Sequence, residues 1–166
     1  MNNLPIIDVL KVPVNPLTMS QSVIYLSNRV KDKLPTTVVT ANAEIIMMGQ
    51  KNRFYLQLLQ QADLVLPDGA GTVWAGRTLG NDVPERVAGF DLFLELVRES
   101  ANKGYRLFFF GSSPGVAEAA RAKCVEAHPQ VKIVGCRNGY FSASDEVDIF
   151  REINASKADI LFVALG

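Results

Sequence analysis

Histidine, cysteine and tryptophan are scarce in this sequence: its 166 residues include 1 His, 2 Cys and 1 Trp. Cys124 and Cys136 provide neither a disulfide framework nor the spacing of a Cys/His metal site. These absences argue against a disulfide-stabilised secreted domain and against a structural zinc site. Both thiols are expected to be small hydrophobic side chains of the core.

An excess of charge of either sign is also lacking, because 17 Lys and Arg balance 17 Asp and Glu. Such a chain has no field that draws in nucleic acid or an anionic membrane from a distance, so we expect no nucleic-acid partner. No apolar run approaches the roughly 18–20 residues of a membrane-spanning helix. The remaining composition, 48% hydrophobic and 20% charged, is ordinary for a globular protein, and the length predicts one domain, residues 1–166.

Segments typical of strands alternate along the chain with segments typical of helices. After an extended segment broken by prolines (5–14), the expected strands are 36–41, 63–66, 105–110, 131–136 and 159–165. The expected helices are 19–30, 43–50, 53–62, 71–79, 90–103, 115–128 and 144–156. Thr18, Asn52 and the pair Ser142 and Asp145 are predicted helix caps. This alternation predicts an α/β fold: a Rossmann-like, doubly wound, mostly parallel sheet with helices on both faces.

Ligands of open parallel sheets bind beyond the carboxyl ends of the strands, so the residues after each strand are the candidate site. The glycine-rich stretch "DGAGTVWAG", residues 68–76, follows one of these strands. It is not a dinucleotide fingerprint, because Trp74 stands where the third glycine is needed. We expect the Trp74 side chain to lie in the core. No P-loop motif occurs either.

Asp68 and Arg86 each allow two interpretations. Asp68 could cap the helix that follows it, or accept a proton from a substrate hydroxyl. Arg86 could pair on the surface with Glu85 or Asp91, or bind a phosphate.

The stretch "GSSPGVAE", residues 111–118, could bind a phosphate at a helix N-terminus, or form an ordinary turn between a strand and a helix. Tyr140 follows another of the expected strands and could lie at the edge of the core. His128 is the single histidine, and we expect it at the end of a helix rather than in catalysis.

Six stretches of the sequence follow one another in this order: "TANAEIIMMGQK", "ADLVLPDGAGTVWAG", "PERVAGFDL", "GSSPGVAE", "NGYFS" and "ILFVALG". Together they resemble the WecG/TagA/CpsF glycosyltransferases, over nearly all of the chain. The resemblance implies an inverting transfer of N-acetylmannosamine from UDP to GlcNAc-diphospho-undecaprenol, for wall teichoic acid or a related polymer. It implies no metal or other cofactor, in keeping with the lack of an Asp-x-Asp pair, and a cytoplasmic location at the inner face of the membrane.

The same resemblance implies roles for individual residues. Asp68 corresponds to the proposed general base, and Arg86 to the cation for the leaving diphosphate. The substrate-binding residues implied are Thr40, Asn42, Gly69, Gly71, Gly111, Ser112 and Tyr140. Other interpretations stay open at this point: a related transferase for another UDP-sugar, such as ManNAcA or glucose, or a nucleotide-binding module without catalysis.

The chain stops after the strand expected at 159–165, whereas family members continue with a further segment and a basic carboxyl-terminal portion. We expect that segment to complete the site and to contact the membrane. We also expect a chain without it to transfer sugar slowly and to form homo-oligomers through apolar surface.

Overall fold

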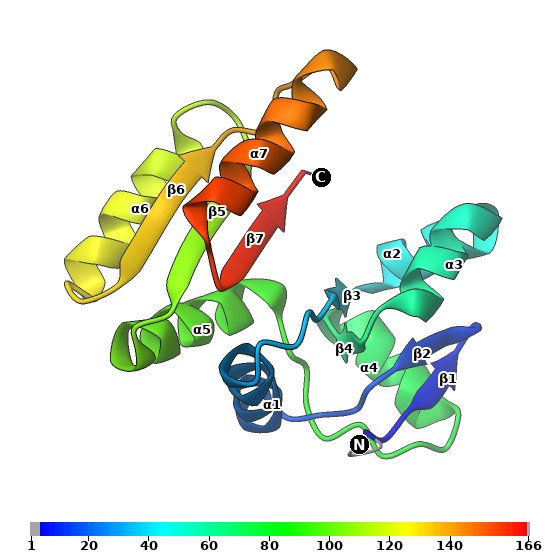
Figure 1. Ribbon diagram of the computed structural model, residues 1–166. Coiled ribbons are helices and arrows are strands. Elements are labelled where there is room, and N and C mark those ends of the chain that lie inside the picture. Colours follow the sequence, from blue (N-terminus) through cyan, green and yellow to red (C-terminus); the bar gives the residue numbers. More distant parts are fainter. Residues whose placement is uncertain (1–3, 166) are drawn as a thin grey trace. The chain divides into compact units, whose positions relative to one another are not determined.

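The computed structural model describes residues 4–165, and its chain contacts divide the protein into two compact units, Met1–Leu92 and Phe93–Gly166 (Figure 1). Every helix and strand expected from the sequence pattern is confirmed, with ends that differ by at most two residues. The first unit contains β1 to β4 and α1 to α4, and the second contains β5 to β7, α6 and α7. Helix α5, Gly89–Lys103, begins in the first unit and ends in the second.

The first unit opens with a β-hairpin rather than a single extended segment. Strands β1, Ile7–Val9, and β2, Val12–Val14, pair antiparallel, with Ile7 opposite Val14. The two turn residues, Leu10 and Lys11, have φ values of 53° and 66°, the left-handed conformation that tight hairpin turns require. The sequence signal was weak because neither residue is a glycine or an asparagine.

A parallel pair of strands stands at the centre of the first unit. Strands β3, Val38–Ala41, and β4, Leu64–Pro67, run side by side with Thr40 opposite Leu66. Asn15 attaches the hairpin to this pair, because its backbone N–H donates to the Val65 carbonyl at 2.7 Å and its Oδ1 accepts the Val65 N–H at 2.8 Å. The side chain of Asn15 is buried, and both its amide oxygen and its amide nitrogen form hydrogen bonds. Asn15 therefore fixes how the hairpin attaches to β4.

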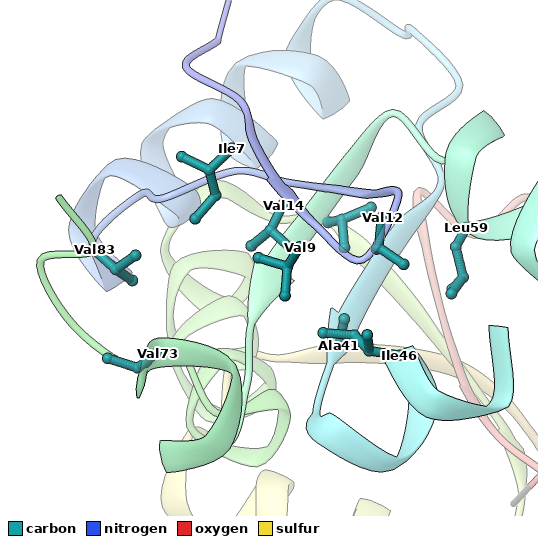
Figure 2. Packing of buried hydrophobic residues seen from close by; sticks show 10 residues of the cluster. Ile7, Val9, Val12, Val14, Ala41, Ile46, Leu59, Val73 and Val83 are labelled. Atoms are coloured by element: carbon teal, nitrogen blue, oxygen red, sulfur yellow. The ribbon is translucent and has the colours of Figure 1, made fainter. Parts of the chain in front are cut away.

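Four helices complete the first unit: α1, Met19–Lys31; α2, Ala43–Lys51; α3, Arg53–Gln61; and α4, Gly69–Thr78. The predicted caps are confirmed, since Thr18 forms a capping box with Gln21 and Asn52 accepts the Tyr55 N–H. Apolar side chains from both pairs of strands and from α2, α3 and α4 pack into one core (Figure 2). Its buried members are Ile7, Val9, Val12, Val14, Ala41, Ile46, Leu59, Val65, Val73 and Val83.

The second unit is built on a parallel sheet of three strands in the order β6-β5-β7. These strands are β5, Arg106–Gly111; β6, Lys132–Arg137; and β7, Ile160–Ala164. Two helices connect them: α6, Val116–Ala127, and α7, Glu146–Ser156, which follows a single 3₁₀ turn, Ala143–Asp145. The capping box between Ser142 and Asp145 is present as predicted.

Side chains of β5 alternate between two apolar layers, as a strand covered on both faces requires. Leu107 and Phe109 pack with residues of α5 and α6, whereas Phe108 and Phe110 pack with residues of α7. Helices therefore cover both faces of this sheet, and the predicted α/β class with parallel strands is confirmed. In the described part of the chain, the parallel strands form two sheets, one in each unit.

Candidate functional site

Three helices, α2, α4 and α5, begin near the carboxyl ends of β3 and β4. Asn42 precedes α2, Asp68 precedes α4, and α5 starts at Gly89. The segment before α5 is tied to the same edge, since the Val87 N–H donates to the carbonyl of Pro67, the last residue of β4, at 2.9 Å. The site was predicted at the carboxyl ends of parallel strands. In the structure, the N-termini of three helices lie at this edge, near Asp68.

The carboxylate of Asp68 is not used to cap the helix that it precedes. Asp68 occupies the N-cap position of α4 but makes no side-chain bond to that helix. Its Oδ2 instead accepts the backbone N–H of Gly89 at 3.1 Å. The capping interpretation offered for α4 is therefore wrong, and the half-buried carboxylate is anchored from a segment 21 residues further along the chain.

Thr40 lies beside the group that holds Asp68. A Cβ atom placed on Gly89 would stand 2.7 Å from the Thr40 Oγ1, closer than Cβ contacts occur in proteins. The Thr40 hydroxyl therefore faces the start of α5 directly. Two predicted site residues, Thr40 and Asp68, thus approach the same short piece of backbone.

Asn42 has a structural task besides the substrate-binding role expected for it. Its Oδ1 accepts the Ile45 N–H at 2.9 Å and so caps α2. Gly69 and Gly71 lie beside this cap. A Cβ on Gly69 would come 3.8 Å from the Asn42 Cβ, and one on Gly71 would come 3.1 Å from the Ala43 Cβ. The two glycines thus let the start of α4 pack closely on the start of α2.

Thr72 holds this edge together and was missed in the sequence. Its side chain is buried, and its hydroxyl donates to the Ala41 carbonyl at 2.9 Å. The same carbonyl accepts the Asp68 N–H at 3.1 Å. The Ala41 carbonyl therefore joins the end of β3 to both the backbone of Asp68 and the first turn of α4. A threonine inside a helix carries no sequence signal for such a role.

Arg86 pairs with Asp91, one of the two partners considered from the sequence. The distance from Arg86 Nη2 to Asp91 Oδ2 is 3.7 Å, and 55% of each side chain is exposed. Glu85, the other candidate partner, instead accepts the backbone N–H of Met19. Arg86 thus stays accessible at the edge where Asp68 lies, one residue before the bond from Val87 to Pro67.

The second unit brings three strand ends together around Ser112. The Ser112 N–H donates to the Ala164 carbonyl of β7 at 2.7 Å, and the Ser112 carbonyl accepts the Gly139 N–H at 2.8 Å. Ser112 itself has a φ of 59°, a conformation uncommon for a residue with a side chain. A Cβ on Gly111 would overlap the Ala164 backbone at 2.2 Å, so Gly111 is required by close strand approach. Gly111 is the last residue of β5 and Ser112 follows it, so both lie at the carboxyl end of this strand, as predicted.

Tyr140 is exposed and not part of the edge of the core, since 74% of it is open to solvent. Its backbone N–H donates to the Asn138 Oδ1 at 3.0 Å, which fixes the turn after β6. The neighbouring Phe141 packs its ring on Phe110, with 5.6 Å between ring centroids. An exposed aromatic ring on a fixed turn suits contact with a flat ligand group.

The expectations for Trp74, for His128 and for the two cysteines remain to be compared with the structure. The one for Trp74 is wrong. Trp74 is 69% exposed, because the buried positions of α4 are Thr72, Val73 and Gly76, on the other side of that helix. His128 is the residue after the last turn of α6, as expected. Cys124 is buried and Cys136 is half-buried, and burial raises the pKa of both thiols.

Within residues 4–165, no three His, Cys, Asp or Glu side chains are grouped so as to hold a metal ion. None of the helices in the described part of the chain is both long enough and apolar enough to cross a membrane.

Comparison with known proteins places nearly all of the chain in one family. The model of a family described as "Glycosyl transferase WecG/TagA/CpsF family" matches residues 7–166. Three relatives bear the name N-acetylglucosaminyldiphosphoundecaprenol N-acetyl-beta-D-mannosaminyltransferase. The Bacillus subtilis protein is 31% identical over 93% of this chain and 60% of its own length. The Bacillus spizizenii protein is 36% identical over 78% of this chain and 49% of its own.

The Staphylococcus aureus relative is 29% identical over 96% of this chain and 63% of its own length. The chain thus spans about half to six-tenths of the length of these relatives. Its family match, however, covers all but the first few residues. This chain belongs to the WecG/TagA/CpsF family of glycosyl transferases.

Proposed function

We propose that the whole protein transfers N-acetylmannosamine from UDP-N-acetylmannosamine to GlcNAc-diphospho-undecaprenol, with inversion at the anomeric carbon and without a metal ion. The names of the three relatives support the sugar and the acceptor. The family membership of residues 7–166 supports the reaction class. The product is a lipid-linked disaccharide of a surface polymer such as wall teichoic acid.

The observation that carries this proposal is the Asp68 carboxylate, which lies at the ends of β3 and β4 without capping its own helix. In an inverting transfer the acceptor hydroxyl attacks the anomeric carbon in one displacement. A bond forms between the acceptor oxygen and that carbon, while the bond from the carbon to the UDP oxygen breaks. The hydroxyl proton passes to Asp68, which acts as general base. A carboxylate is a strong enough base for this step because the hydroxyl loses its proton as the new bond forms.

Arg86 stabilises the negative charge that grows on the UDP leaving group. A guanidinium places two donors on neighbouring phosphate oxygens. Its present partner, Asp91, is an exposed carboxylate 3.7 Å away, and such pairs contribute at most about 1 kcal/mol. Arg86 can therefore exchange this partner for a diphosphate at little cost.

The other predicted site residues bind the substrates. Thr40 and Asn42, with the close backbone at Gly69 and Gly71, contact polar groups of the sugars. Gly111 and Ser112 receive the nucleotide at the end of β5, and Tyr140 stacks on the uracil ring. The exposure of Tyr140 and the fixed turn at Asn138 support the last of these roles.

The protein acts at the inner face of the cell membrane, where its lipid-linked acceptor lies, and the 166-residue chain self-associates. The apolar side chains of β7 support self-association, because Leu161 and Val163 are 41% and 56% exposed on a strand at the end of its sheet.

A donor panel tests the proposed function. The whole protein, at its natural length, is incubated with a soluble GlcNAc-diphosphate-lipid analogue and with UDP-ManNAc, UDP-ManNAcA or UDP-glucose, with and without EDTA. We expect transfer from UDP-ManNAc alone, a product with inverted anomeric configuration by NMR, and no loss of rate in EDTA. Transfer from another sugar, or with retained configuration, would contradict the proposal.

A further inference from the structure

We infer that Gly89 is a positioning residue for the general base, in that its N–H holds one oxygen of the Asp68 carboxylate so that the other faces the acceptor. This inference rests on the proposed function of Asp68. Its first observation is the hydrogen bond from the Gly89 N–H to the Asp68 Oδ2, at 3.1 Å. In the described part of the chain, Oδ1 of Asp68 accepts no hydrogen bond, so this oxygen is the one that takes the acceptor proton.

The second observation is the space around Gly89. A Cβ at this position would meet three atoms of Thr40: Oγ1 at 2.7 Å, Cβ at 3.4 Å and Cγ2 at 3.5 Å. Any larger side chain would push the start of α5 away from the end of β3, or turn the Thr40 hydroxyl out of its place. A side chain at position 89 would therefore disturb either the bond from the Gly89 N–H to Asp68 or the position of the Thr40 hydroxyl.

The backbone on both sides of this hydrogen bond is itself restrained. The Val87 N–H donates to the Pro67 carbonyl at 2.9 Å, and the Leu92 N–H donates to the Ala88 carbonyl at 2.9 Å. On the other side, the Asp68 N–H donates to the Ala41 carbonyl at 3.1 Å. Donor and acceptor are thus carried by short pieces of fixed chain, and the carboxylate cannot rotate without losing the bond.

A base held in this way reduces the rearrangement needed as the acceptor attacks. Misplacing a reacting group by about 1 Å costs on the order of 10²-fold in rate. A change at Gly89 should therefore lower the rate of the chemical step and leave donor binding almost unchanged. Loss of fold also lowers the apparent rate without changing the KM, so the folded fraction of each variant must be measured to separate it from a positioning role.

The test compares two glycine substitutions, each of which places a Cβ 2.7 Å from a side-chain atom of the first unit. Gly89→Ala places a Cβ 2.7 Å from Thr40 Oγ1, and Gly76→Ala places one 2.7 Å from Val83 Cγ2, in the core of the same unit. Rates are measured with the whole protein and corrected for the folded fraction. We expect Gly89→Ala to lower kcat by about 10- to 10²-fold with the KM for UDP-ManNAc little changed, and Gly76→Ala to lower stability alone. Equal kcat values for both variants would overturn the inference.

A second readout needs no catalysis and keeps the inference testable if Gly89→Ala does not fold. The amide resonance of Gly89 is followed by ¹H–¹⁵N NMR in the 166-residue chain and in its Asp68→Ala variant. We expect a clear shift of this resonance when the carboxylate is removed, and an unmoved resonance would overturn the inference. If the unchanged protein transfers no sugar at all, the proposed function fails, while the amide shift still decides whether Gly89 holds Asp68.

Discussion

The guanidinium of Arg86 lies 3.7 Å from the carboxylate of Asp91, with both side chains 55% exposed at the entry to α5. An ion pair this open to solvent stabilises a fold by at most about 1 kcal/mol. Its contribution to stability therefore does not explain why an arginine stands here. A cation that can leave its partner easily is suited to a ligand that carries more charge than the partner does.

Replacing Arg86 should affect catalysis far more than folding. We expect Arg86→Ala to lower kcat/KM by at least about 10²-fold, because one charge-stabilising donor to a developing anion contributes on that scale. Arg86→Lys should recover only part of this loss, since an ammonium cannot donate to two oxygens in fixed geometry. The measurement is steady-state transfer from UDP-ManNAc by the whole protein.

Asp91→Asn is the matched control for Arg86, because it breaks the same ion pair from the other side. It should leave transfer within a few-fold of the unchanged protein. Near-normal activity in both Arg86→Ala and Asp91→Asn would reduce Arg86 to a surface residue and remove it from the mechanism.

Asn42 and Asn52 both cap helices, but only Asn42 is proposed to contact a substrate. Comparing the two residues therefore separates the substrate role of Asn42 from its role as a cap. Each side chain accepts a backbone N–H at the start of a helix, from Ile45 at 2.9 Å and from Tyr55 at 3.1 Å. Loss of either cap should lower the free energy of unfolding by about 1 kcal/mol in urea titrations. Asn42→Ala should in addition raise the KM for a substrate, whereas Asn52→Ala should not.

Asn42→Ser refines this comparison, since serine also caps helices well. We expect it to retain stability and still to bind substrate more weakly, because the amide group is gone. A KM in Asn42→Ser equal to that of the unchanged protein would show that Asn42 is a cap only.

Tyr140 should contribute to nucleotide affinity without contributing to stability. Base–aromatic stacking is worth about 1–3 kcal/mol, so Tyr140→Ala should weaken UDP binding by about 5- to 150-fold in calorimetry. Tyr140→Phe should keep most of the affinity, since the ring remains. Phe150→Ala is the control in the same unit, because Phe150 is also an exposed aromatic, at 62%. Equal effects of the two alanine variants would speak against stacking.

The strand β7 should mediate self-association. It stands at the end of the order β6-β5-β7, and its exposed Val163 lies opposite Phe110 in the register of the sheet. We expect Val163→Lys to convert the 166-residue chain from oligomer to monomer in light scattering, because a lysine on an edge strand opposes pairing. A chain that is monomeric before the substitution would contradict this expectation.

Much of the fold could be predicted from the sequence because its signals are local. Runs such as "RLFFF", and caps such as Thr18 and Asn52, fix helices and strands through period and hydrogen bonding alone. The hairpin turn at Leu10 and Lys11 was missed for a physical reason. Its left-handed residues are imposed by pairing of β1 with β2 and by side-chain bonds from Gln50 and Gln60 to the turn carbonyls.

The candidate site was only partly predictable, because its decisive contacts join distant segments. The motif around Asp68 indicated a carboxylate beyond a strand, but not that its partner is the N–H of Gly89. The expectation that Trp74 lies in the core is wrong, because the buried side of α4 is filled by smaller residues. Thr72 and Gly89 act through a backbone carbonyl and a backbone N–H, for which sequence carries no pattern.

The turnover of Asp68→Asn, measured beside its UDP affinity, tests the central claim most directly. Asparagine keeps the size of the side chain and an oxygen that can accept the Gly89 N–H, but it cannot take the acceptor proton. We predict a fall in turnover of about 10²–10⁴-fold with unchanged UDP affinity and an unchanged free energy of unfolding. Turnover within a few-fold of the unchanged protein would show that Asp68 serves the fold and is not the base.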